Sequence, residues 1–166
     1  MAMLSKLIPE SNTLKEFLSY LTAIVVSIAI LIWIYGLLKI DLNYLLVNRG
    51  GSDEWFQAMV TKGLIDNGWF WHNSFVGMPT GLDLYDFPHF DSLPLFIMKI
   101  ISLFFRNYAA TMNIYFLLTF IFTALTSMFV LRHFGISRLS SVVGSVLYNF
   151  LPYHFATGEI HLTLAS

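Results

Sequence analysis

The sequence predicts an all-α integral membrane protein with about three transmembrane helices. Two features of its composition support this prediction: the 166 residues are 57% hydrophobic and only 11% charged, and 17% of them are aromatic. A soluble core of this size cannot hide so much apolar surface from water, so much of that surface must meet lipid or other membrane segments. The third observation is that long apolar runs without charge recur along the chain.

The first predicted element is a transmembrane helix over residues 17–38. This run carries no charge, is rich in Leu, Ile, Val and Ala, and ends before Lys39. About 20 apolar residues suffice for a helix to cross the bilayer. A cleavable signal peptide is the alternative, but its apolar region would usually be shorter and would end in a small-residue cleavage site. This run ends in Gly36-Leu37-Leu38, which favours a retained span.

Two further transmembrane helices are predicted over residues 108–131 and 139–157. The connector between them, residues 132–138, is long enough only for a tight hairpin, so the two helices are expected to be antiparallel neighbours. Small residues allow helix backbones to approach each other closely in lipid. In the third helix such residues recur at i,i+4 spacing: Ser140 with Gly144, and Ser141 with Ser145.

The region between the first two spans, residues 39–106, is predicted to form one large loop. Its segment 93–105 is apolar but shorter than the ~20 residues of a span, which predicts an interfacial or re-entrant helix. Arg132 and Arg138 lie at helix ends, where the positive-inside bias is most reliable. They place the connector and the N-terminus in the cytoplasm, and the large loop on the extracytoplasmic side of the cell membrane.

The composition also excludes several classes of function. Without cysteine the chain has no disulfide framework, thiolate zinc site or Cys nucleophile. With a formal net charge of −1 and no run of Lys or Arg, it lacks a surface that could follow a nucleic-acid backbone. The sequence ends inside an apolar segment without a helix-stop signal, so we expect a single N-terminal portion of a longer multi-pass protein, truncated at its C-terminus.

The strongest candidate for chemistry in the loop is the pair Asp53-Glu54. The apolar residues that follow recur at helical spacing and predict an amphipathic helix that begins near Ser52. Carboxylates in the first turn of a helix face the positive end of its dipole, which favours the ionised form. A deprotonated Asp53 is therefore a candidate general base. The alternative is that both acids simply suit a helix N-terminus.

A second polar cluster occupies residues 83–91, where three Asp residues and His89 lie close in sequence. Carboxylates and imidazole can bind a divalent metal, but their spacing here matches no specific metal-binding signature. We favour solvated loop acids and expect no cofactor. The aromatic segment 69–72 that precedes this cluster is typical of a membrane-interface belt, with a sugar-stacking platform as the alternative.

The end of the predicted third span carries further polar residues. His154, Glu159 and His161 would emerge at the same membrane face as Asp53. Polar groups at this depth are costly and often functional. For His154 alone, an ordinary interfacial position is the preferred interpretation.

The order of these features resembles the GT-C superfamily of membrane glycosyltransferases. In its protein O-mannosyltransferases and aminoarabinose transferases an Asp-Glu pair opens a helix soon after the first span, and Asp53-Glu54 looks like that pair. Those families continue with a Tyr/His-Pro-Pro-Leu element, whereas residues 87–95 read Phe-Pro-His-Phe-Asp-Ser-Leu-Pro-Leu and lack the Pro-Pro pair. Segments 130–137, 148–154 and 158–161 are more similar to the large bacterial YfhO-type membrane proteins.

The resemblance implies an inverting transferase that moves a sugar from a polyprenyl-phosphate-linked donor to an envelope polymer, lipid or protein. A polyprenyl-phosphate is already a good leaving group, so the reaction needs one base and no strong general acid. Asp53 would be that base and Glu54 would orient it. The residues expected to line the donor phosphate and sugar are His89, Asp91, His154, Glu159 and His161. The alternatives are a transporter or flippase-like subunit, and a structural membrane subunit whose acidic loop docks a partner.

Overall fold

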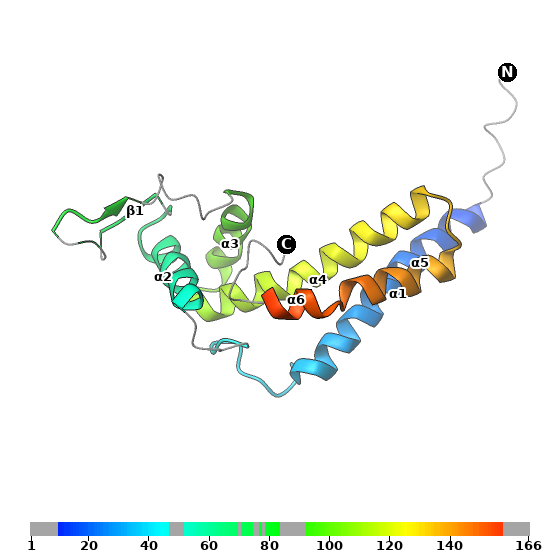
Figure 1. The fold of residues 1–166 in the computed structure, drawn as a ribbon, viewed down its shortest axis with the longest axis horizontal. Helices are drawn as coiled ribbons and strands as arrows, with labels where there is room; N and C mark the ends of the chain where they lie inside the picture. The colour runs from blue at the N-terminus through cyan, green and yellow to red at the C-terminus, as the bar shows by residue number, and fades with distance from the viewer. Residues whose placement is uncertain are drawn as a thin grey trace, which may run out of the picture. The chain divides into compact units, whose positions relative to one another are not determined.

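The computed structural model describes residues 10–46, 52–69, 71–74, 77, 79–83 and 92–157. These residues are mostly helical, as predicted, and their elements are shown in Figure 1. In chain order the elements are α1 (Glu10–Tyr35), α2 (Ser52–Asp66), β1 (His72–Asn73), β2 (Leu82–Asp83), α3 (Ser92–Phe104), α4 (Tyr108–His133), α5 (Arg138–Asn149) and α6 (Pro152–Thr157). They form two compact units. The first holds α1, α4 from Phe120 onward, and α5; the second holds α2, β1, β2, α3, α4 up to Thr119, and α6.

Two of the helices are long and apolar enough to cross a membrane. They comprise Asn12–Tyr35 in α1 and Tyr108–His133 in α4. Both coincide with predicted spans, residues 17–38 and 108–131. The α1 helix begins earlier than predicted because a charged residue such as Glu16 ends an apolar run without breaking a helix. It ends at Tyr35, and the next residue, Gly36, has a φ of +60°, a conformation that glycine adopts at little cost.

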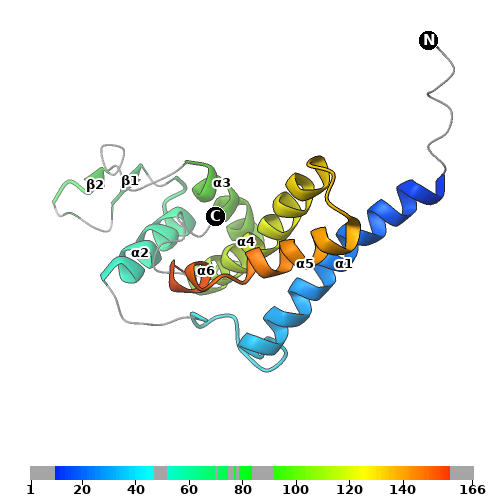
Figure 2. The ribbon, with the colours of Figure 1, turned by 45° about the vertical axis from the view of Figure 1, so that its right-hand side comes forward.

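In the first unit, α1 packs against α5 through small side chains. The two helices lie side by side in Figures 1 and 2. The small residues of α1 that are buried recur every fourth position: Ser19, Ala23 and Ser27. On α5 the corresponding positions are Ser141, Ser145 and Asn149, all fully buried. The Asn149 amide donates a hydrogen bond of 3.1 Å to the Ser27 hydroxyl across this seam.

These observations confirm the close packing expected of the small residues in the third predicted helix, with one exception. Ser141 and Ser145 are buried. At Gly144 an added Cβ would lie 3.1 Å from the Leu131 side chain of α4, so a larger residue there would force Leu131 to move. Ser140 is exposed and lies outside this packing.

The predicted tight hairpin between α4 and α5 is present. Gly135 has a φ of +78° and ends α4. The Gly135 N–H donates to the Arg132 carbonyl and the Ile136 N–H donates to the Leu131 carbonyl, which together form a Schellman motif. Ser137 then caps α5 by accepting a hydrogen bond from the Ser140 N–H.

An ion-pair network joins this hairpin to the beginning of α1. The Arg132 Nε donates to Glu16 at 2.6 Å, and the Arg138 Nε donates to the other oxygen of that carboxylate at 2.8 Å. Arg138 also donates to the Asn12 side chain at 3.2 Å. Consequently α1 and α5 begin at the same end of the first unit, where α4 ends.

The predicted helix over residues 139–157 is divided in the structure. Helix α5 ends at Asn149, and α6 begins at Pro152. Proline has no N–H to donate and its ring clashes with the preceding turn, so it is accepted at the start of a helix and not inside one. Each of the two helices is shorter than the ~20 residues that a straight span requires. The third transmembrane segment therefore stays a prediction. The prediction that it forms one continuous helix is wrong.

In the second unit, α2 packs against α3. Helix α3 confirms the helix predicted over residues 93–105 to within one residue. The Lys99 amino group donates to the Leu64 carbonyl at 2.6 Å, which satisfies a carbonyl near the C-terminus of α2. The Thr61 hydroxyl and the Met98 sulfur, 4.0 Å apart, lie at the same contact.

A short antiparallel hairpin follows α2. Its strands pair His72 with Asp83 and Asn73 with Leu82. The sequence did not predict these strands. Asn73 is buried against α2, where a Cβ added to Gly63 would lie 2.8 Å from the Asn73 side-chain nitrogen. Gly63, in the middle of a helix, is therefore explained by the close approach of the hairpin.

Candidate functional site

The two candidate catalytic carboxylates lie in the first turn of α2 and differ in accessibility. Helix α2 begins at Ser52, where the sequence predicted its start. Asp53 is exposed, whereas Glu54 is only 1% exposed. Both lie in the first turn of α2, at the positive end of the helix dipole. Asp53 is therefore the solvent-accessible carboxylate of the pair.

Glu54 belongs to a buried polar face of α2. Gln57 and Thr61 follow it at i+3 and i+7, and all three side chains are at most 7% exposed. Residues with this spacing lie on one side of a helix. Burying a carboxylate costs free energy unless polar groups surround it. Three polar side chains of α2 are thus buried on one side of the helix, while Asp53 is exposed.

Asn113 on α4 holds the segment that leads into α2. Its amide nitrogen donates to the Leu42 and Tyr44 carbonyls, both at 2.8 Å. Its amide oxygen accepts from the Leu46 N–H at 3.0 Å. Sequence reasoning missed this residue, although an amide inside an apolar run is a signal that could have identified it.

His154 on α6 is buried in the second unit. Its Nε2 lies 2.8 Å from the Thr119 hydroxyl of α4. The Phe116 ring meets the imidazole edge to face, with centroids 6.2 Å apart. The ring thereby holds α6 against α4, which is a structural role. The expected role of His154 in lining a substrate stays a prediction.

The remaining predicted site residues, His89, Asp91, Glu159 and His161, lie outside the described residues. Of the acidic cluster at 83–91, only Asp83 is described. Its carboxylate lies 2.8 Å from the His72 Nδ1, and both side chains are more than half exposed. Within the ranges that the structure describes, no three His or acidic side chains gather into a metal-binding group.

The site therefore offers one accessible carboxylate at the N-terminus of a well-held helix. Such a group can accept the proton of a hydroxyl nucleophile. Comparisons of the chain with protein-family models, with curated proteins and with solved structures found no match.

Proposed function

We propose that the chain belongs to an inverting membrane glycosyltransferase of the GT-C type. It would move a sugar from a polyprenyl-phosphate-linked donor to an acceptor of the cell envelope, on the extracytoplasmic side. The observation that carries this proposal is the pair at the start of α2, with Asp53 exposed and Glu54 buried. This helix follows a helix that is long and apolar enough to cross a membrane, which is the arrangement that the resemblance implies.

In the proposed reaction Asp53 is the general base. Its carboxylate takes the proton of an acceptor hydroxyl as the hydroxyl oxygen attacks the anomeric carbon of the donor sugar. The bond between that carbon and the phosphate oxygen breaks, and the polyprenyl phosphate leaves with the bonding electron pair. Attack opposite the leaving group inverts the anomeric configuration. General base catalysis of this kind typically contributes about 10²–10⁴-fold to the rate.

The proposed topology has the N-terminus and the hairpin at Gly135 in the cytoplasm. Arg132 and Arg138 at the hairpin support this orientation through the positive-inside bias. The third span would comprise α5 and α6 together, with the break before Pro152 inside it. A broken helix is tolerated at membrane depth where protein surrounds the freed backbone groups. The end of this span and the start of α2 would then face the same side.

The test is the change Asp53→Asn, which keeps the size of the side chain and removes its basicity. The sugar content of envelope polymers is measured in host cells that produce the wild-type protein, the variant or neither. Loss of the base is expected to lower sugar transfer by about 10²-fold or more. Glu54→Gln is expected to have a milder effect.

Asp41→Asn is the matched control, because Asp41 is exposed and the hydrogen bonds of its side chain in the described part of the chain all involve neighbouring Asn43. It should leave sugar transfer unchanged. Wild-type transfer by the Asp53→Asn variant would remove Asp53 from the role of base. Transfer that does not depend on the protein at all would instead favour a transporter or a scaffold.

A further inference from the structure

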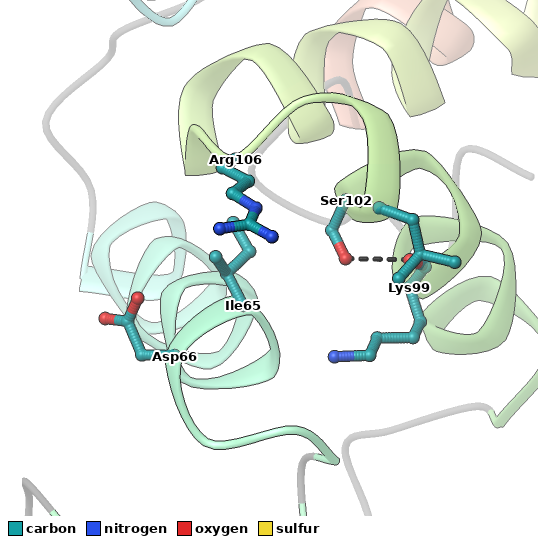
Figure 3. Close-up of a pocket in the computed structure, with 6 residues that line it drawn as sticks. Ile65, Asp66, Lys99, Ser102 and Arg106 are labelled. Carbon is teal, nitrogen blue, oxygen red and sulfur yellow. Dashed lines mark hydrogen bonds between the residues drawn. The ribbon is translucent and has the colours of Figure 1, made fainter.

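A pocket of about 550 Å³ lies between the C-terminal ends of α2 and α3, within the second unit. It is lined by Ile65, Asp66, Lys99, Ser102, Leu103 and Arg106. Figure 3 shows the Lys99 amino group and the Arg106 guanidinium in the space between the two helices, with the Asp66 carboxylate turned away from Lys99. The pocket includes neither Asp53 nor Glu54, so it is separate from the candidate site for sugar transfer.

The charges of this pocket favour a monoanion. Lys99 uses one of its three N–H donors on the Leu64 carbonyl, which leaves two for a ligand. Asp66 is paired with Lys62 at 2.8 Å. Arg106 takes part in none of the ion pairs found among the described residues. With two cations and one carboxylate, the lining has a net charge of one positive unit.

Helix α3 presents apolar side chains on two sides. One side is buried within the unit: Pro94, Leu95, Met98 and Ile101. The other side is exposed over Leu93, Phe96, Ile100 and Leu103, which recur at helical spacing. An exposed apolar stripe of this kind is typical of a helix that lies in the membrane interface.

Arg106 lies two residues before Tyr108, where the long apolar helix α4 begins. If α4 spans the bilayer, Arg106 is at the level of the lipid headgroups. Guanidinium and ammonium groups near a membrane surface attract anionic lipids, and a guanidinium binds phosphate oxygens in a bidentate manner.

We propose that this pocket binds the phosphate of an anionic glycerophospholipid. Arg106 and Lys99 contact the phosphate oxygens, and the exposed stripe of α3 that ends at Leu103 contacts the acyl chains. A phosphodiester carries one negative charge, whereas a phosphomonoester such as polyprenyl phosphate carries about 1.5 to 2 negative charges. The charge of the lining therefore matches the phosphodiester better. The inference rests on the membrane placement of α4 in the proposed function and does not depend on sugar transfer.

The test measures lipid retained by the full chain in a neutral detergent, by native mass spectrometry. Phosphatidylglycerol and phosphatidylcholine with the same acyl chains are added in parallel, and undecaprenyl phosphate is added in a third arm. The wild-type chain is expected to retain phosphatidylglycerol in preference to both. Arg106→Gln should weaken that retention about fivefold, the effect of one basic residue near a lipid surface. Lys39→Gln, an exposed lysine outside the pocket, should leave it unchanged.

Equal retention of phosphatidylglycerol and phosphatidylcholine would overturn the inference, as would unchanged retention by Arg106→Gln. Preferential retention of undecaprenyl phosphate would overturn the assignment to a glycerophospholipid. Arg106 is exposed, so its substitution leaves the packing of α3 intact, whereas Lys99→Gln also removes a contact with α2. Extraction of the chain from membranes by alkaline carbonate would contradict the membrane placement on which the proposed function rests. Loss of the lipid preference in a chain that resists this extraction would contradict this inference alone.

Discussion

Asn113 is the residue on which the approach to the candidate site depends most directly. Three hydrogen bonds of its side chain reach backbone groups of one segment, residues 42–46, which leads from α1 towards α2. The side chain is fully buried. A buried amide with its donors and its acceptor satisfied stabilises one position of the chain, because any other position would leave these groups without partners.

Replacement of Asn113 by Ala is predicted to lower the free energy of unfolding by about 1–2 kcal/mol. Removing one partner of a buried hydrogen bond costs about 1–3 kcal/mol, and the half-exposed backbone of residues 42–46 can recover part of this from water. Asn113→Asp should be worse, since it places a carboxylate opposite two carbonyls. Thermal unfolding in detergent measures the stability of both Asn113 variants, and Asn43→Ala, at an exposed position, is the control. Equal stability of Asn113→Ala and Asn43→Ala would contradict this role.

The sequence could identify Asp53 and Glu54 as a pair but not assign their different environments. Neighbouring residues on a helix point about 100° apart, so one of two adjacent acids is expected to face inward. Which one does so depends on the packing of the whole face. Gln57 and Thr61 are polar, so the periodicity of apolar residues does not identify them as part of the buried face of α2. The burial of Glu54 therefore required the structure.

Among the elements, the seam between α1 and α5 shows how small side chains set the distance between two helices. Ser27 on α1 and Ser145 on α5 both belong to it, and both are fully buried. Lipid tails are as apolar as leucine, so helices in a bilayer associate through close packing and hydrogen bonds more than through burial of apolar area. The hydrogen bond between Asn149 and Ser27 fits this pattern.

Ser145→Leu is predicted to destabilise the first unit by about 1–3 kcal/mol. The larger side chain has no room at the seam and must displace α1 or adopt a strained rotamer. Ser140→Leu, the same change at an exposed position of α5, should stay within about 0.5 kcal/mol of the wild type. Thermal unfolding of both variants in detergent gives the comparison. If Ser145→Leu lowers the stability no more than Ser140→Leu does, the seam between α1 and α5 is not closely packed.

The elements were predicted to different degrees, for physical reasons. Apolar runs located α1, α3 and α4, because a helix of this kind is defined by its own side chains. The apolar run at 139–157 predicts one helix, although Pro152 is a signal for the break between α5 and α6. The hairpin of β1 and β2 was missed, because two-residue strands are held by their contact with α2 and carry almost no periodicity of their own.

At the scale of the whole molecule, the sequence predicts on which side of the membrane each segment lies. The two long apolar helices are consistent with spans, and the ion pairs of Glu16 place the start of α1 beside the hairpin between α4 and α5. Which side of the bilayer each segment faces depends on charge bias and on membrane insertion. The fold of the chain alone does not give this orientation. The side that Asp53 faces is therefore the central claim that requires a measurement.

That measurement is the labelling of single cysteines in intact cells. The chain has no cysteine of its own, so each introduced thiol is the only target. Ser137→Cys reports on the hairpin, Trp55→Cys on the start of α2, and His161→Cys on the region after α6. A membrane-impermeant maleimide is expected to label positions 55 and 161 from outside, and position 137 only after the cells are opened. Labelling of 55 and 161 from opposite sides, or of 55 and 137 from the same side, would contradict a shared extracytoplasmic site.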